Sequence, residues 1–197
     1  FSAAGPALGA KRMTASLFPP HSSEPAGIEL GYGIVDVAGA ALYQSGAYHH
    51  LHTKQILSVA RHRGWTSADL ATDDMKGAGA TLFGASVGAY GNIEKTATGW
   101  QLTMNVFQGN RHSKLARSLP ADAAAAVQSG GLEIARAIAA LGRIELPDRA
   151  VHPRGTSGAA MSAYLSCYAV LVRQPMGLRE SHVVEVSTLA AARKRWE

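Results

Sequence analysis

The stretch GATLFGASVGAYGNIEKTATGWQLTMNVF, residues 79–107, carries the strongest fold signal in this chain. Its second half alternates apolar and polar side chains, a pattern typical of a strand that buries one face. Residues 96–99 are turn-forming types that separate the two halves. The stretch therefore predicts a β-hairpin, with one strand over residues 80–90 and its partner over residues 100–107.

The first expected strand places the small residues Gly84, Ser86 and Gly88 on one face. Small residues at alternate positions indicate that another element packs closely over that face. A helix expected over residues 34–44 is the best candidate for this cover. A larger side chain at Gly84 should then overpack the contact.

The same stretch contains a G-x-S-x-G match at residues 84–88. In that motif a nucleophilic serine lies on a strand-to-helix turn, which makes Ser86 the candidate catalytic residue of a serine hydrolase. The motif needs a helix directly after Gly88, but Gly91 and Asn92 disfavour one. We therefore favour the hairpin and keep the hydrolase as the alternative function.

A hydrolase would also need an acid and a histidine after its serine. Asp148 with His152 or His182 supplies them in the chain order of α/β-hydrolases. All three fall in an expected linker and tail, and such common residue types satisfy an order rule by chance. No phosphate-binding loop of the Walker type and no G-x-G-x-x-G motif occurs, so nucleotide binding is not predicted.

Two clusters hold potential metal or acid-base groups. His50 and His52 would share a strand face about 7 Å apart beside His49, but no Cys, Asp or Glu lies within a few residues to complete a zinc site. Asp73 and Asp74 are expected in the middle of a helix, on a solvated face. We expect no metal and no cofactor, and interpret the histidine strand as a surface or partner-facing polar strand.

The remaining elements give a β-α-β-α-α-β-β-β-α order. A loop is expected over residues 21–33, and a helix that enters at Thr66 is expected to stop at Gly77 and Gly79. The other expected strands cover residues 12–18, 47–53 and 112–119, and the other expected helices cover residues 34–44, 55–63 and 120–141. This order predicts an α/β domain over residues 11–141, with a mixed sheet and flanking helices.

Beyond this domain, residues 142–157 contain prolines and glycine without periodicity and are expected to form a linker. Residues 158–197 are expected to form a C-terminal α-helical hairpin. Its apolar residues need either the α/β domain or another chain to cover them, and the prolines of the linker favour an outward-projecting hairpin covered by a partner. The partner-binding residues predicted there are Met161, Leu165, Tyr168, Val183, Val186 and Leu189.

Composition narrows the class of protein further. The chain has 197 residues and a net charge of +5, with basic residues scattered through the sequence, so we expect no nucleic-acid partner. No run of about 18 apolar residues occurs, which predicts no integral membrane segment and leaves a peripheral membrane location open. The single cysteine, Cys167, lies in an apolar run and is expected to be a buried, inert thiol.

Several of these features resemble the TolB amino-terminal-like domain. They are the Gly79-Ala80 pair before the central strand, the G-x-S-x-G pattern of residues 84–88 and the Thr98-Gly99 turn. Residues 31–63 look like the family's leading strand and amphipathic helix, and the likeness covers residues 11–141. The domain recurs in bacterial envelope proteins, including relatives of the curli secretion channel protein and of flagellar and lipoprotein assembly factors.

The tail is similar to the start of a tetratricopeptide array, on the strength of Tyr164, Ala169 and the turn at Pro175. Such arrays often follow the TolB-like domain. Together the two resemblances imply a non-enzymatic scaffold or assembly protein of the periplasm or cell envelope. Its partners would be other proteins of an envelope assembly, including other copies of this chain.

Overall fold

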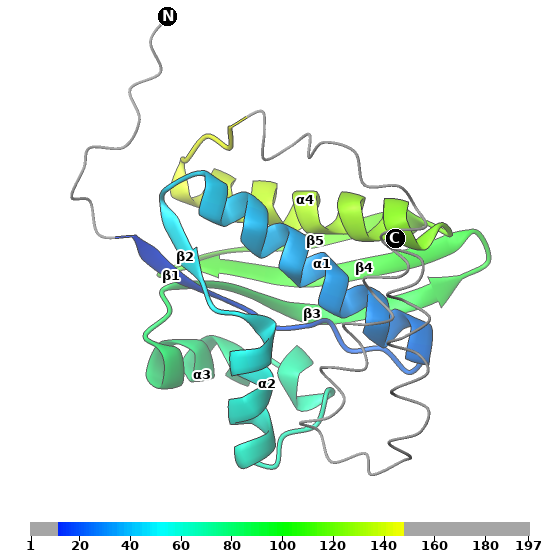
Figure 1. The fold of residues 1–197 in the computed structure, drawn as a ribbon, viewed down its shortest axis with the longest axis horizontal. Helices are drawn as coiled ribbons and strands as arrows, with labels where there is room; N and C mark the ends of the chain where they lie inside the picture. Colours follow the sequence, from blue (N-terminus) through cyan, green and yellow to red (C-terminus); the bar gives the residue numbers. More distant parts are fainter. Residues whose placement is uncertain (1–11, 148–197) are drawn as a thin grey trace, which may run out of the picture.

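The computed structural model describes residues 12–147 as an α/β domain, which confirms the predicted fold class (Figure 1). One mixed sheet of five strands, in the order β2-β1-β3-β4-β5, carries helices on its faces. The elements are β1 (Met13–Leu17), α1 (Pro25–Gln44), β2 (Tyr48–His50), α2 (Thr53–His62), the 3₁₀ helix η1 (Asp69–Ala71), α3 (Asp74–Phe83), β3 (Val87–Thr96), β4 (Gly99–Gln108), β5 (Arg111–Pro120) and α4 (Ala123–Gly142).

Strand β1 lies inside the sheet and pairs in parallel with β2 on one side and β3 on the other. Strands β3, β4 and β5 follow as an antiparallel meander. Two-residue loops close its hairpins, because Thr96 pairs with Gly99 and Gln108 pairs with Arg111. The predicted pairing of residues 100–107 with the preceding strand is therefore confirmed.

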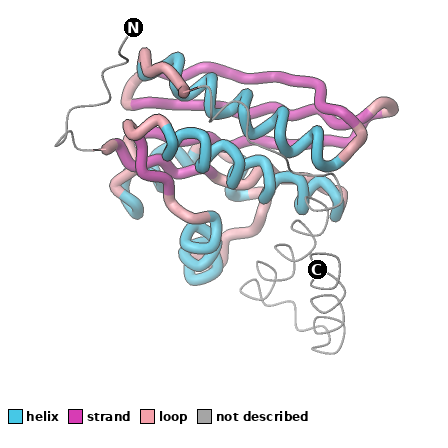
Figure 2. Tube along the Cα trace, turned by 45° about the horizontal axis from the view of Figure 1, so that its top comes forward, coloured by secondary structure: helices cyan, strands magenta, loops and turns pink. Residues whose placement is uncertain are grey.

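Helices α1 and α4 lie side by side across one face of the sheet (Figures 1 and 2). Between them and the strands lies the larger core, to which the sheet contributes the alternate residues of β3, β4 and β5. Helix α4 is confirmed but begins at Ala123 rather than at residue 120, because Pro120 still belongs to β5 and the helix starts at a cap in which the Asp122 side chain accepts a hydrogen bond from Ala125 N (2.8 Å).

A smaller core lies on the opposite face, under α2, η1 and α3. The sheet contributes Tyr90 and Phe107 to it, which alternate along their strands with residues of the larger core. Helix α3 touches β1 and β3, and no described helix makes a comparable contact with this side of β4 and β5. Within the described residues, this face of the sheet is thus only partly covered.

The predicted first strand of the hairpin is wrong over residues 80–86. Helix α3 continues through Gly77 and Gly79 to Phe83, and the chain leaves it at Gly84, whose φ of 60° is the left-handed helix cap that favours glycine. Gly79 stays helical because it packs against β1: a Cβ there would lie 2.7 Å from Ser16 Oγ. Close packing thus outweighs the low helix propensity of glycine.

Two other boundaries differ from the predictions. Helix α1 begins at Pro25 rather than near residue 34, because the glycines of its first turns are buried, with Gly31 directly against Pro20. Thr66 and Asp69 do form the reciprocal cap that was predicted, since Asp69 Oδ2 accepts from Thr66 N (2.6 Å). That cap opens the short η1 helix only, and α3 starts separately at Asp74.

The expected linker extends beyond the described residues, and the expected C-terminal helical hairpin lies wholly outside them. The six predicted partner-binding residues of the tail are therefore not placed by the structure. Over residues 12–147, no helix combines the length and the apolar character that a membrane crossing requires.

Candidate functional site

Ser86 lies exposed at a bend between the end of α3 and the start of β3. A helix precedes this serine and a strand follows it, which reverses the strand-to-helix order of a nucleophile elbow. Its carbonyl oxygen accepts a hydrogen bond from Gly109 N (2.7 Å), so Ser86 helps to fix the β4–β5 turn. Asp148, His152 and His182 lie outside the described residues.

The close packing predicted for the small residues is found at Gly88 and not at Gly84. A Cβ on Gly88 would clash with the Ser16 carbonyl of β1 and lie 2.6 Å from Phe107 Cζ. A Cβ on Gly84 would meet nothing within 4 Å. The predicted cover is also wrong, because α1 lies on the other face, and the neighbours of Gly88 are β1 and the Phe107 ring.

Of the three clustered histidines, His49 and His52 are exposed as predicted, and His50 is less exposed than predicted. The His50 ring is half-buried over Gly39 of α1, and its centroid lies 5.5 Å from that of His52. Burial and the neighbouring His52 lower the pKa of His50, and the charge of Asp36 opposes them in part. Within residues 12–147, no group of three or more His, Cys, Asp or Glu residues is arranged to hold a metal ion.

Asp73 and Asp74 lie at the beginning of α3, whereas the sequence predicts them in mid-helix. The Tyr90 hydroxyl donates a hydrogen bond to Asp73 Oδ1 (2.9 Å), which ties the start of the helix to β3. Burial, and then this hydrogen bond and the charge of Asp73, raise the pKa of Tyr90 to about 12. No local pattern reveals this contact, because it depends on how α3 packs over the strand.

A cleft of about 320 Å³ opens beside this contact, between α3 and the partly covered face of β4 and β5. Its basic residues are Lys76 of α3 with His112 and Lys114 of β5, and its acidic residue is Asp73. We call it the Lys76–Lys114 cleft. The residues that line it are Asp73, Lys76, Tyr90, Asn105, Val106, Phe107, His112, Ser113 and Lys114.

A second hollow of about 530 Å³ lies next to the cleft and shares Lys76 and Phe107 with it. The exposed Ser86 lines this hollow with Gly84 and Asn110. No described residue gives the Ser86 hydroxyl a hydrogen-bonding partner. The part of the chain that the structure describes therefore contains neither the base nor the local fold that would activate this serine.

Strand β5 is a long edge of the sheet. It has ten residues, and no other strand among residues 12–147 pairs with its outer side. Since Gln108 and Arg111 close a two-residue hairpin, the backbone groups of residues 111, 113, 115, 117 and 119 face β4. Those of residues 112, 114, 116 and 118 therefore face away from the sheet. The opposite edge, β2, has only three residues.

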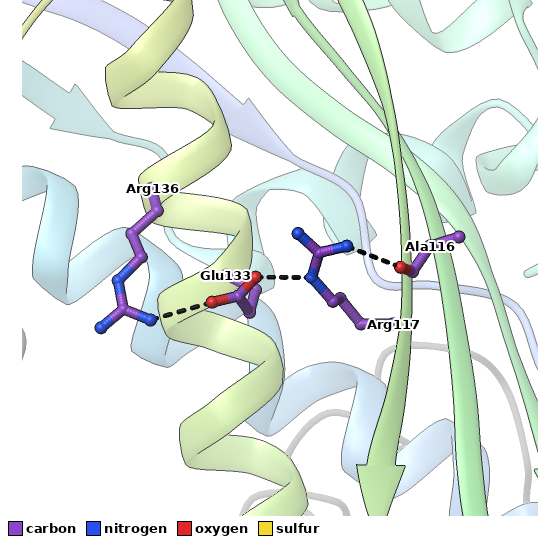
Figure 3. Close-up of polar contacts among 4 residues, drawn as sticks. All are labelled: Ala116, Arg117, Glu133 and Arg136. Carbon is purple, nitrogen blue, oxygen red and sulfur yellow. Dashed lines mark hydrogen bonds and ion pairs between the residues drawn. The ribbon is translucent and has the colours of Figure 1, made fainter.

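One outward carbonyl of this edge has a partner (Figure 3). The Arg117 guanidinium donates to the Ala116 carbonyl oxygen (3.0 Å) and, through Nε, to Glu133 Oε2 of α4 (2.7 Å). Glu133 also accepts from Arg136 (2.8 Å), and the hydrogen bond from Arg117 is the main cause of the lowered pKa of this carboxyl. The network holds the Arg117 side chain against the middle of the edge.

No protein-family model, curated protein or solved structure matches the chain. The features that can indicate a function are therefore those of the chain itself. They are the outer edge of β5, the basic Lys76–Lys114 cleft next to it and the exposed Ser86.

Proposed function

We propose that this protein is a non-enzymatic scaffold or assembly protein of the bacterial cell envelope that binds partner proteins. One observation carries the proposal: β5 offers ten residues of sheet edge without a neighbouring strand in the described part of the chain. An exposed edge of this length is a template for main-chain pairing with another protein. The periplasm or cell envelope as its location rests on the resemblance to the TolB amino-terminal-like domain.

The surroundings of the edge support this proposal. The face of β4 and β5 next to it lacks a helical cover among the described residues, and it carries polar side chains such as Asn105, Gln101 and Ser118. Polar faces of this kind suit an interface that forms and separates, because non-obligate interfaces are about as polar as the rest of a protein surface.

The serine hydrolase is less well supported. Ser86 follows a helix and precedes a strand, and no described residue is hydrogen bonded to its hydroxyl. A fluorophosphonate probe separates the two functions, because it labels an activated serine only. Labelling of the wild-type chain that disappears in Ser86→Ala would overturn the non-enzymatic proposal.

Photo-crosslinking tests the binding surface itself. A photoreactive residue at Ser118, exposed on β5, should give a discrete cross-linked partner in a bacterial envelope fraction. The matched control is the same residue at Lys54, which is exposed on α2. Equal cross-linking from the two positions, or none from Ser118, would show that the β5 edge is not the binding surface.

The predicted tail surface is a second part of the proposal. Apolar residues at helical spacing over residues 158–196 would be covered by a partner protein or by another copy of the chain. The tail and β5 are separate candidate surfaces, so the loss of one would leave the other to be tested.

A further inference from the structure

We infer that β5 binds an extended, acidic segment of a partner protein, which adds to the sheet as a sixth strand along residues 112–116. This inference rests on the proposed protein-binding function and names the chemistry of the partner. The added strand would place an acidic side chain at the Lys76–Lys114 cleft.

The backbone supplies the first argument. On the outer side of β5, residues 112 and 114 each present one N–H and one carbonyl, and Ala116 presents its N–H. Arg117 already occupies the Ala116 carbonyl. Among residues 12–147, five outward groups without a strand partner therefore form a run at the hairpin end of β5, which is enough for a short strand addition.

Charge decides the kind of partner. Strand β5 contains Arg111, His112, Lys114 and Arg117 and no acidic residue. Like charges on adjacent strands are destabilising, so these residues oppose pairing with a second copy of β5. Arg117 is already paired with Glu133, so it is the charges of Arg111 and Lys114 that attract a strand with Asp or Glu at alternating positions.

The cleft supplies the second, independent argument. Side chains at residues 112 and 114 point to the partly covered face of the sheet, where they line the cleft with Lys76. A side chain directly opposite Lys114 on an added strand would lie about 5 Å from it, Cβ to Cβ. Lys76 of α3 lines the same cleft on the side away from the added strand, so its positive charge adds to that of Lys114, and the charge of Asp73 opposes the two in part.

The experiment is a selection of linear twelve-residue peptides, displayed on phage, on the full chain. We expect the selected peptides to be enriched in alternating Asp or Glu. Their binding should fall by about tenfold or more in Lys114→Glu, a loss of about 1.4 kcal/mol. The Lys54→Glu variant is the control, because it makes the same charge change on the exposed side of α2.

Ala116→Pro tests the main-chain pairing. The Ala116 N–H faces away from β4, so proline removes an outward donor without removing a bond of the existing ladder. This variant should keep its circular dichroism spectrum and lose peptide binding. Hydrogen exchange supplies a readout on the wild-type chain, in which bound peptide should slow the amides of residues 112, 114 and 116.

Each outcome decides the matter. Selected peptides that are neutral or basic would overturn the acidic chemistry, while slowed exchange at residues 112–116 would keep the partner-binding function in place. Acidic peptides that bind Ala116→Pro and slow no β5 amide would overturn strand addition. A failure of any peptide to be enriched would overturn the inference, and a cross-linked partner at Ser118 would still support the proposed function.

Discussion

Gly88→Ala should destabilise the protein, because Gly88 pairs directly with Ser16 of the neighbouring parallel strand β1. The added Cβ would clash with the Ser16 carbonyl and would lie 2.6 Å from Phe107 Cζ. A carbonyl held in a parallel strand pair cannot rotate away as a side chain can, so β1 and β3 have to move apart.

The size of the effect follows from two opposing contributions. Overpacking of a filled interior lowers the free energy of unfolding by about 1–3 kcal/mol. Alanine also reduces the conformational entropy of the unfolded chain, which raises the free energy of unfolding by about 0.4–1 kcal/mol. The expected net loss is about 1–2 kcal/mol. In a chain of this size each kcal/mol shifts Tm by about 2–4 °C, so Tm should fall by roughly 2–8 °C.

Urea unfolding of the full chain, followed by tryptophan fluorescence, measures this change, since Trp100 is buried in the core. Gly77→Ala is the matched control, because this exposed helical glycine has nothing within 4 Å of an added Cβ. It should raise stability by about 0.5–1 kcal/mol. A Gly88→Ala protein as stable as wild type, beside the expected gain at Gly77, would refute the close approach of β1.

Three further predictions concern pH, a hydrogen bond and assembly. Because the pKa of His50 is lowered in the folded protein, the unfolded chain takes up the His50 proton at a higher pH, and the free energy of unfolding should fall as pH drops below about 6.5. The urea midpoints of the wild-type protein at pH 7.5 and pH 5 should therefore differ more than those of His50→Gln. An equal difference in the two proteins would contradict this prediction. Tyr90→Phe should reduce the free energy of unfolding by about 0.5–1.5 kcal/mol through the lost hydrogen bond to Asp73. A double-mutant cycle with Asp73→Ala, which removes the acceptor, measures the coupling, and additive losses would contradict the hydrogen bond. Light scattering should find self-association or a larger complex for the full chain and a monomer for residues 1–146; two monomers with a helical tail would contradict assembly through residues 158–196.

The sequence was most informative where local patterns and tertiary packing agree. The alternation of residues 100–107 predicted β4, and the helical pattern of residues 120–141 predicted α4. The predicted helix boundaries were wrong where glycine serves close packing. The glycines of α1 and α3 look like loops and stops, but Gly31 lies against Pro20 and Gly79 lies against Ser16, which no local pattern can reveal.

The candidate site could be predicted only in part. Ser86 was recognised as a weak candidate because the helix that an elbow requires does not follow it, and a strand does follow. The cleft was missed, since Lys76 and Lys114 line it together only because α3 packs over β1 and β3 and, in the described part of the chain, leaves the same face of β5 open. The edge was missed because strand order is a property of the whole sheet, and the basic residues of β5 become meaningful only once β5 is known to be outermost.

The strand order also has a consequence for how the chain folds. The β3–β4–β5 meander is closed by two-residue loops, so its pairing is local and is expected to form early. The β1–β3 pairing places Ser16 opposite Gly88, and the Ser16 hydroxyl donates to the Val87 carbonyl across 71 residues, so this pairing carries a larger entropy cost of loop closure. β1 is therefore expected to enter the sheet late, between β3 and β2, after the folding transition state. Substitutions along the β1–β3 seam should then speed unfolding more than they slow folding.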